Sequence, residues 1–243
     1  DFKGGYIKLS DFRGSENQEP RTLEAIANPD CGWFYRASAA EFKKIPGSPI
    51  AYFISNCIRD AFVKNQSFSE YFFSDGLTKT GNNDKYLRFH WEVPRYSAVN
   101  PDCYRICVKG GDARDYFGNT DNLVDWRPVA REHYRKDNVA RITPEYLWEI
   151  SGISWTKISS RGPTFRWFGN GMIAETGGPA IFVKESASKE LFWQGLGFLT
   201  SKVNWQILTS LNPTLNFQTN DVLTLPLNVE ATKATSIHTE KLV

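Results

Sequence analysis

The spacing of hydrophobic residues changes between helical and strand-like along the chain. Between residues 48 and 66, apolar side chains recur every three or four positions, as on one buried face of an α-helix. Ser48 and Pro49 suit the N-cap and the first turn of that helix. The same spacing predicts the longest helix at residues 188–211. Its expected buried stripe is Leu191, Phe192, Leu196, Leu199, Val203, Ile207, Leu208 and Leu211.

Short apolar segments bounded by turn residues predict strands in most of the remaining chain. They are "GYIKLS" and "GWFYRAS" within residues 1–47, "KYLRFHWEV" at 85–93, residues 105–108, four segments between 152 and 185, and "VLTLPL" at 222–227. Residues 126–142 are charged and show no clear periodicity, whereas 144–151 should form a short helix. These elements predict an α+β fold, with a mixed or mostly antiparallel sheet flanked by helices at about 48–66 and 188–211.

The composition is that of a globular protein with one large domain or two small ones. Of the 243 residues, 41% are hydrophobic and 14% are aromatic, which is enough for a sizeable core. No apolar run approaches the ~18 residues that span a bilayer, and the first residues are too polar for a signal peptide. Because the chain begins with Asp1 and its only Met is Met172, we expect a fragment with a further segment upstream.

Positive charge is concentrated in the middle of the chain. The net charge is +2, yet residues 76–170 carry 15 basic and 11 acidic residues, and each flank has a net charge of −1. Arginine predominates in this central surplus, and its planar fork suits bidentate contacts with phosphate and guanine. An ordinary solvated surface is the alternative explanation for so small a surplus.

No motif in the sequence predicts catalysis or a metal site. Cys103 and Cys107 have C-x3-C spacing, but no second close pair completes four zinc ligands. "NPDC" occurs at 28–31 and 100–103, and both copies read as Asn-Pro turns. "GNGMIAETGG" at 169–178 lacks the preceding strand and following helix of a dinucleotide-binding loop. The sequence therefore favours a binding module over an enzyme.

The best candidate surface of that module is the central basic segment. Its cations alternate with small polar residues and aromatics, and they are Lys79, Lys85, Arg88, Lys109, Arg114, Arg161 and Arg166. In "GLTKTGNNDKYLRF" (76–89), the backbone amides of residues 80–82 suit one phosphate. Such a loop positions a duplex without reading its sequence.

Five segments, in chain order, share features with one protein family. They are "IPGSPIAYFIS" (45–55), "GLTKTGNNDKYLRFHWEV" (76–93), "KGGDARDYFGNTDNLVDW" (109–126), "GISWTKISSRGPTFRW" (152–167) and "LTSKVNWQILTSLNPTLNFQTNDVLTLPL" (199–227). They resemble the target-recognition region of adenine-specific DNA methyltransferases of the BREX phage-exclusion (PglX) family and of related fused restriction–modification enzymes. Two departures from the family pattern are the additional Lys79 between Thr78 and Thr80, and Tyr86 where Phe is usual.

The resemblance implies a C-terminal part of a longer enzyme that methylates adenine N6 with S-adenosylmethionine after base flipping. The family's cofactor loop and Asn-Pro-Pro-aromatic loop do not occur here, so we expect no catalytic residue, no cofactor and no activity in this chain alone. The expected organisation is a connecting and helical segment at 1–75, a recognition domain at 76–230 and a loose tail at 231–243. The implied partners are double-stranded DNA, an upstream methyltransferase domain and other phage-defence proteins, in a prokaryotic cytoplasm and without a membrane.

We expect the DNA-contacting face to consist of three turns: 78–83, 109–114 and 159–166. The residues expected to contact DNA are Thr78, Lys79, Thr80, Asn82, Asn83, Lys85, Lys109, Arg114, Ser159, Ser160, Arg161 and Arg166. Lys79 and Lys109 are assigned to phosphates, and Arg161 and Arg166 to bases. Trp155 and Trp167 occur in apolar strands and should be structural.

Two other functions remain open at this point. The chain is alternatively a protein-interaction scaffold of the same defence complex, without direct DNA reading, or a small enzyme with an unfamiliar site. Salt-sensitive DNA binding would argue against the scaffold. A cofactor bound to the purified protein would favour the enzyme.

Overall fold

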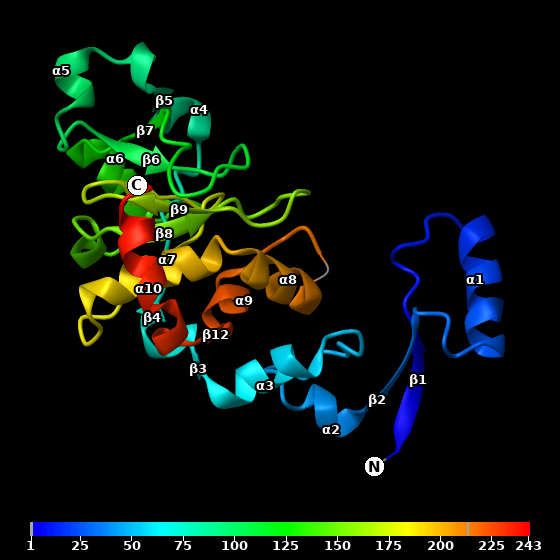
Figure 1. The fold of residues 1–243 in the computed structure, drawn as a ribbon. Coiled ribbons are helices and arrows are strands. Elements are labelled where there is room, and N and C mark those ends of the chain that lie inside the picture. The colour runs from blue at the N-terminus through cyan, green and yellow to red at the C-terminus, as the bar shows by residue number, and fades with distance from the viewer. Residues whose placement is uncertain (1, 213) are drawn as a thin grey trace. The chain divides into compact units, whose positions relative to one another are not determined.

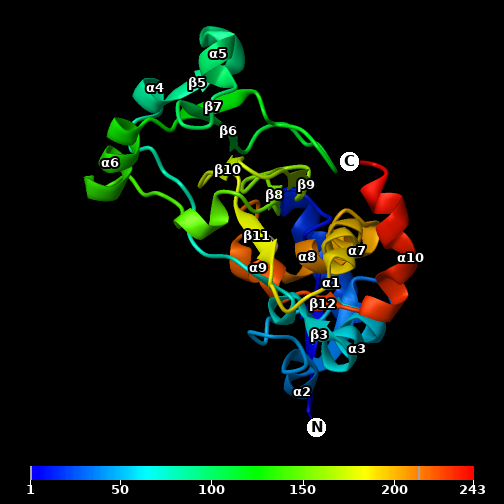
Figure 2. The ribbon, with the colours of Figure 1, turned by 90° about the vertical axis from the view of Figure 1, so that its left-hand side faces the viewer.

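The computed structural model describes residues 2–212 and 214–243, and Figures 1 and 2 show their path in two views. The chain divides into two compact units, Asp1–Gln66 and Ser67–Val243. This boundary precedes the one expected after residue 75. The functions assigned to the predicted segments remain predictions.

The first unit combines a two-stranded sheet with helices. Its strands β1 (Lys3–Ile7) and β2 (Phe34–Ser38) pair antiparallel. The ring of Tyr6 stacks on that of Tyr52 with centroids 4.9 Å apart, so β1 packs against the segment that contains Tyr52. The helices are α1 (Ser15–Ala27), α2 (Ala39–Phe42) and α3 (Asn56–Lys64). Helix α1 occupies a stretch for which only strands and loops were expected.

The helix expected at about 48–66 is shorter than its hydrophobic spacing indicated. Ser48 has a φ of 48°, a left-handed value that is incompatible with its role as an N-cap. Helix α3 begins at Asn56, and the side chain of Ser55 caps it by accepting a hydrogen bond from the Ile58 N–H. Ser48 and Ser55 both precede apolar residues, so the sequence pattern alone did not show which of them caps the helix.

The first sheet of the second unit has the strand order β10-β6-β7-β5. The strands are β5 (Leu87–Phe89), β6 (Tyr104–Val108), β7 (Asn122–Asp125) and β10 (Ile173–Ala174). Strand β10 is parallel to β6, and β7 pairs antiparallel with both β5 and β6. Helix α6 (Pro128–Lys136) contributes Ala130 and Tyr134 to the hydrophobic core of this sheet, although its sequence shows no clear periodicity.

The second sheet is antiparallel, with the order β4-β11-β8-β9. Its strands are β4 (Phe72–Phe73), β8 (Gly152–Trp155), β9 (Phe165–Phe168) and β11 (Ala180–Val183). Phe168 and Phe182 contribute to a core cluster that also contains Val108 of β6 and Ala174 of β10. The two sheets of this unit therefore share hydrophobic packing.

The helix expected at 188–211 is divided into α7 (Lys189–Leu199) and α8 (Lys202–Leu211). The Ser201 hydroxyl accepts a hydrogen bond from the Asn204 N–H at 3.1 Å and so caps α8. The Asn204 side chain donates to the Leu199 carbonyl at 2.7 Å, which satisfies a C-terminal carbonyl of α7. Of the expected stripe, Val203 is exposed and Leu211 is half-buried, while the other members are buried.

The tail expected to be loose at 231–243 instead contains helix α10 (Val229–Glu240), packed against α7. The Asn228 side chain caps it, and the Thr232 hydroxyl donates to the Gln194 carboxamide at 3.2 Å. A Cβ on Gly197 of α7 would lie 2.4 Å from the Thr239 hydroxyl, so the two helices approach closely at this glycine. The contact face of α10 consists of small polar residues, which is why hydrophobicity did not reveal it.

The remaining elements are short. They are β3 (Gln66–Ser67), α4 (Asn83–Tyr86), α5 (Arg95–Ala98), α9 (Thr219–Leu223) and β12 (Pro226–Leu227), with 3-10 turns at Phe68–Glu70, His90–Glu92 and Glu145–Leu147. The strand expected at 85–93 is thus reduced to β5, and the helix expected at 144–151 to one 3-10 turn. The predicted α+β class, with mostly antiparallel sheets, is confirmed. Within the described part of the chain, no helix has both the length and the apolar character needed to cross a bilayer.

The burial of Cys107 predicts a difference in cysteine reactivity. Burial raises the pKa of the Cys107 thiol to about 12, whereas Cys57 is exposed. Because the thiolate is the nucleophile, a maleimide at pH 8 should label Cys57 in the folded chain and Cys107 only after unfolding. Mass spectrometry of the labelled peptides tests whether Cys57 is labelled before Cys107, and rapid labelling of Cys107 in the folded chain would contradict this order.

The same raised pKa makes the contribution of Cys107 to stability depend on pH. The folded thiol keeps its proton where the unfolded thiol loses it, so this contribution decreases as the pH rises from about 9 towards about 12.

Candidate nucleic-acid interface

The segment 76–89 forms a bridge, a capped turn and the start of β5. The Thr78 N–H donates to the Ala174 carbonyl at 3.0 Å, and the Lys79 N–H donates to the Arg141 carbonyl at 2.9 Å. The Asn82 side chain then caps α4 by accepting a hydrogen bond from the Lys85 N–H at 3.0 Å. The carboxamide oxygen of Asn82 is thus used within the turn. The main-chain hydrogen bonds of Thr78 and Lys79 fix the start of the expected phosphate loop, and the Asn82 cap fixes its end.

A hollow of about 460 Å³ opens beside α4 and β5. Asn83, Asp84, Leu87, Arg88 and Phe89 line it from these elements, and Glu92, Lys109 and Asn122 complete its lining. We call it the α4–β5 hollow. The register of the sheet explains part of this set, because Phe89 on β5 lies opposite Asn122 on β7.

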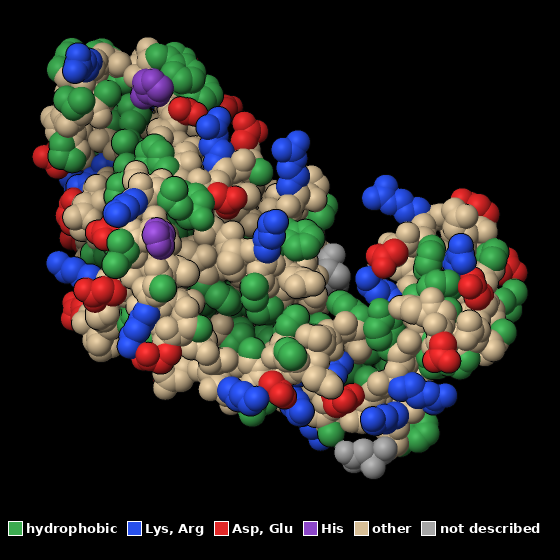
Figure 3. Space-filling view, viewed as in Figure 1, with side chains coloured by type: hydrophobic (Ala, Val, Ile, Leu, Met, Phe, Trp, Pro, Cys, Tyr) green, Lys and Arg blue, Asp and Glu red, His purple; other side chains and the backbone are tan. Residues whose placement is uncertain are grey.

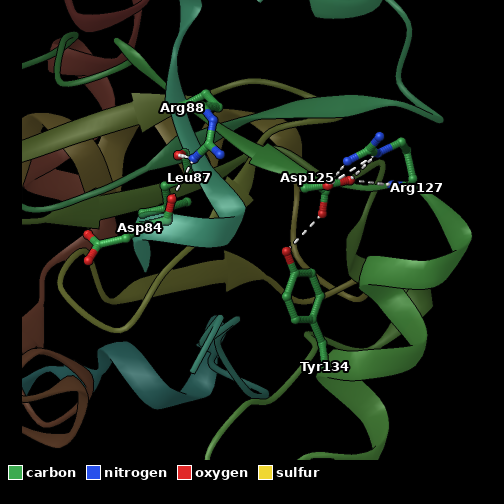
Figure 4. Close-up of polar contacts among 6 residues, drawn as sticks. All are labelled: Asp84, Leu87, Arg88, Asp125, Arg127 and Tyr134. Atoms are coloured by element: carbon green, nitrogen blue, oxygen red, sulfur yellow. Dashed lines mark hydrogen bonds and ion pairs between the residues drawn. The ribbon is translucent and has the colours of Figure 1, made fainter. Parts of the chain in front are cut away.

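Arg88 carries the clearest potential for binding a ligand in this hollow. Its Nη1 donates to the carbonyl oxygens of Asp84 and Leu87 at 2.7 and 2.6 Å. Figure 4 shows both contacts and shows the Asp84 carboxylate directed away from the guanidinium. Among the described residues, no carboxylate forms an ion pair with Arg88. The main chain therefore holds the guanidinium while its other N–H groups remain available.

The second arginine in Figure 4, Arg127, has its charge balanced within the protein. Its Nε donates to both oxygens of Asp125, at 3.0 and 3.2 Å, and this contact raises the pKa of Arg127. Tyr134 donates to the main-chain oxygen of Asp125 at 2.9 Å, and burial raises the pKa of this phenol. The Arg127 fork is therefore less available to an outside anion than that of Arg88.

The surface around the hollow is mixed in charge. Figure 3 shows Lys and Arg side chains near α4 and β5 next to Asp and Glu side chains, with hydrophobic groups between them. A continuous basic area is not visible on this face of the second unit. Nucleic-acid binding here would therefore depend on particular residues more than on a broad positive field.

The predicted contact residues differ in their accessibility. Lys79, Asn82, Asn83, Lys85, Arg114, Ser160 and Arg161 are exposed, Lys109 and Ser159 are half-buried, and Thr78, Thr80 and Arg166 are buried. The Thr80 hydroxyl donates to the Asn83 side-chain oxygen at 2.6 Å. The two threonines therefore support the turn from inside, and their side chains are not on the surface.

The role expected for Arg166 does not fit its position. The side chain is fully buried, and its Nη1 donates to the hydroxyl of Thr156 at 3.2 Å and to the carbonyl of Arg114 at 3.4 Å. Burial lowers the pKa of Arg166 to about 10. Arg166 thus holds the main chain of the loop after Lys109, and a buried guanidinium does not reach a base edge.

Only two of the three expected turns meet at the hollow. Asn83 from the first turn and Lys109 from the second both line it. The third turn does not line the hollow: it contacts the second turn through the buried Arg166, while the Ser159 N–H donates to the Leu215 carbonyl at 3.0 Å and Gly162 lies against the ring of Trp205 on α8. Contacts between any of these residues and DNA remain predictions.

The segments that resembled catalytic or cofactor loops form hydrogen bonds within themselves. The side-chain oxygens of Asn28 and Asn100 accept hydrogen bonds from the N–H groups two residues later, at 3.1 and 3.0 Å. Both "NPDC" copies are therefore turns, as predicted. In the glycine-rich 169–178 segment, the buried Glu175 carboxylate accepts from the Gly177 N–H at 3.0 Å. This carboxylate therefore stabilises the turn of its own loop.

Sequence reasoning did not assign Arg88, Phe89 or Asn122 to the contact set. Arg88 belongs to the basic segment, but the alternating pattern of "KYLRFHWEV" predicts an ordinary strand. Phe89 and Trp91, two positions apart, were a usable indication, because both remain exposed and their rings stack 4.5 Å apart. No pattern in the sequence identified Asn122.

Comparison with known proteins shows what the chain is similar to. No family model matches it. Over its whole length, however, the chain is similar to adenine-specific methyltransferases, so the resemblance predicted from five segments is confirmed.

Two curated bacterial proteins are similar to the chain. "Adenine-specific methyltransferase PglX" of Lacticaseibacillus casei (strain Zhang) is 27% identical over 259 aligned residues, covering 100% of this chain and 21% of that protein. "Adenine-specific methyltransferase BrxX" of Escherichia coli O9:H4 (strain HS) is 28% identical over 231 residues, covering 93% of this chain and 18% of that protein. The chain spans about a fifth of the length of these relatives.

Proposed function

We propose that this chain is the DNA-recognition part of a BREX-type adenine-specific DNA methyltransferase. It binds double-stranded DNA and contributes sequence preference to a longer enzyme. The observation that carries the proposal is Arg88, whose guanidinium is fixed by two main-chain carbonyls and has no carboxylate partner among the described residues. The similarity to PglX and BrxX supports the same function.

The chemistry of methyl transfer is assigned to the rest of the longer protein. S-adenosylmethionine would supply the methyl group there. The three segments of this chain that resemble catalytic or cofactor loops, 28–31, 100–103 and 169–178, form internal hydrogen bonds. This chain would hold the duplex in position, with Lys79 and Lys109 on phosphates and Arg88 on a base edge. Arg161 remains a proposed base contact on a different part of the surface.

Duplex binding across a salt series tests the proposal. Fluorescence anisotropy of a labelled 20-base-pair duplex should give an affinity that falls as salt rises, with a slope of about −0.9 per neutralised phosphate. Lys79→Ala and Lys109→Ala should each weaken all sequences about equally and reduce the slope by about one. The matched control is Lys136→Ala, because Lys136 is exposed and pairs with Glu132 at 2.6 Å. Salt-independent binding by the wild-type chain, or wild-type slopes in both variants, would contradict the proposal.

A second candidate function, docking of another protein, is favoured by an apolar hollow near α5. This hollow of about 480 Å³ is lined by Val93, Val99, Ile106 and Leu123, among others. Val99 in this lining is strongly exposed, as is Tyr96 on α5. Exposed apolar residues around a hollow are typical of protein contacts. If the wild-type chain showed no salt-dependent DNA binding, this candidate would be favoured over the first.

A further inference from the structure

The α4–β5 hollow has an aromatic wall. Phe89 lines the hollow, and Trp91 stacks on it with centroids 4.5 Å apart and an interplanar angle of 4°. Phe89 is 42% exposed and Trp91 is 64% exposed. Each ring of a stacked pair covers only one face of the other, so flat aromatic surface remains available for a further ring. Trp91 also fixes the orientation of Phe89.

The polar lining of the same hollow offers both donors and acceptors. Arg88 is held in place by main-chain carbonyls, and among the described residues the side chains of Lys109 and Asn122 form no internal hydrogen bond or ion pair. Asp84 and Glu92 supply carboxylates, and the Glu92 carboxylate accepts from the Phe89 N–H at 2.8 Å. The lining therefore presents N–H groups and oxygens close to one aromatic ring.

The charge balance of the lining distinguishes between ligands. Two cations, Arg88 and Lys109, are matched by two carboxylates, Asp84 and Glu92. A phosphate in the hollow would meet both carboxylates, which disfavours a bare anion. A nucleobase is uncharged, carries donors and acceptors on its edge and has a flat face for stacking. The hollow of about 460 Å³ also falls within the ~300–1,000 Å³ range of small-ligand sites.

We propose that the α4–β5 hollow binds one unpaired nucleobase of DNA, stacked on the Phe89–Trp91 pair. The inference rests on the proposed function, since it requires that the chain binds DNA. The base must be unpaired because both of its faces are covered by neighbouring bases in an intact duplex. Arg88 and Asn122 would contact its edge, and the backbone contacts of the proposed function, including that of Lys109, would lie outside the stacked base.

Three otherwise identical 20-base-pair duplexes test the proposal. One is perfectly paired, one contains a single bulged 2-aminopurine nucleotide, and one contains an abasic nucleotide at the bulge. The wild-type chain should bind the 2-aminopurine bulge about tenfold more tightly than the abasic bulge, and should quench its fluorescence by stacking. In Phe89→Ala the ratio of these affinities should fall to about one. Tyr146→Ala, which removes an exposed aromatic ring outside the hollow, should keep the wild-type ratio.

The outcomes separate this inference from the proposed function. Equal binding of the wild-type chain to all three duplexes, without fluorescence quenching, would overturn the nucleobase site and leave DNA binding intact. Absence of binding to every duplex would overturn both. A preference for the base that survives in Phe89→Ala, with quenching unchanged, would also overturn the assignment of the base to this hollow. Quenching by the wild-type chain is independent of how well the variant folds.

Discussion

Trp155→Ala is expected to lower the free energy of unfolding by about 3–5 kcal/mol. Trp155 is fully buried at the end of β8, its Nε1 donates to the Phe217 carbonyl at 2.9 Å, and its ring lies 5.6 Å from that of Phe165. Alanine would leave a large cavity and an unpaired buried carbonyl. The position confirms the structural role predicted for Trp155, whereas Trp167 is only half-buried against Phe117.

Urea denaturation followed by circular dichroism measures this effect. Trp205→Ala is the control, because Trp205 is 50% exposed on α8 and should cost much less. Trp155→Phe retains much of the ring and removes the hydrogen bond, so it should fall between the wild type and Trp155→Ala. A Trp155→Ala midpoint equal to that of Trp205→Ala would contradict the assignment of Trp155 to the core.

Arg88→Ala is expected to weaken binding to a preferred duplex by about 1–3 kcal/mol and to relax the preference at one position. Carbonyls of Asp84 and Leu87 already orient the guanidinium, so little side-chain entropy is lost when DNA binds. Arg88→Lys should not restore the affinity, because an ammonium group lacks the planar fork for a bidentate contact.

Competition binding with preferred and scrambled duplexes measures this effect. Arg135→Ala provides the matched control, since Arg135 is exposed on α6 and its charge is paired with Glu145 at 2.5 Å. We expect the control to keep the wild-type affinity and preference. If Arg88→Ala and Arg135→Ala had the same affinities for both duplexes, Arg88 would not be the base contact.

Regular hydrophobic spacing was sufficient to predict much of the second unit. The strands at 105–108 and 152–168 and the helix α7 appear where apolar residues recur with the period of a buried face. Prediction failed where polar side chains determine the structure. The division between α7 and α8 depends on hydrogen bonds of Ser201 and Asn204, and α10 packs through threonines against Gly197.

The candidate site was less predictable than the fold, because it depends on which charges are paired. In the sequence, Arg88, Arg127 and Arg166 are equivalent cations. In the structure, main-chain carbonyls hold Arg88, Asp125 balances the charge of Arg127, and Arg166 is buried. Asn83 and Lys109 line the same hollow because β5 and β6, which are distant in the sequence, both pair with β7.

Selection from a pool of random duplexes tests the central claim most directly. The 243-residue chain would be mixed with the pool at moderate salt, and the bound duplexes would be sequenced over successive rounds. We predict enrichment of one sequence pattern by the wild-type chain, and loss of preference at one position of that pattern with Arg88→Ala. Binding without enrichment of any pattern would contradict the claim that this chain reads DNA sequence.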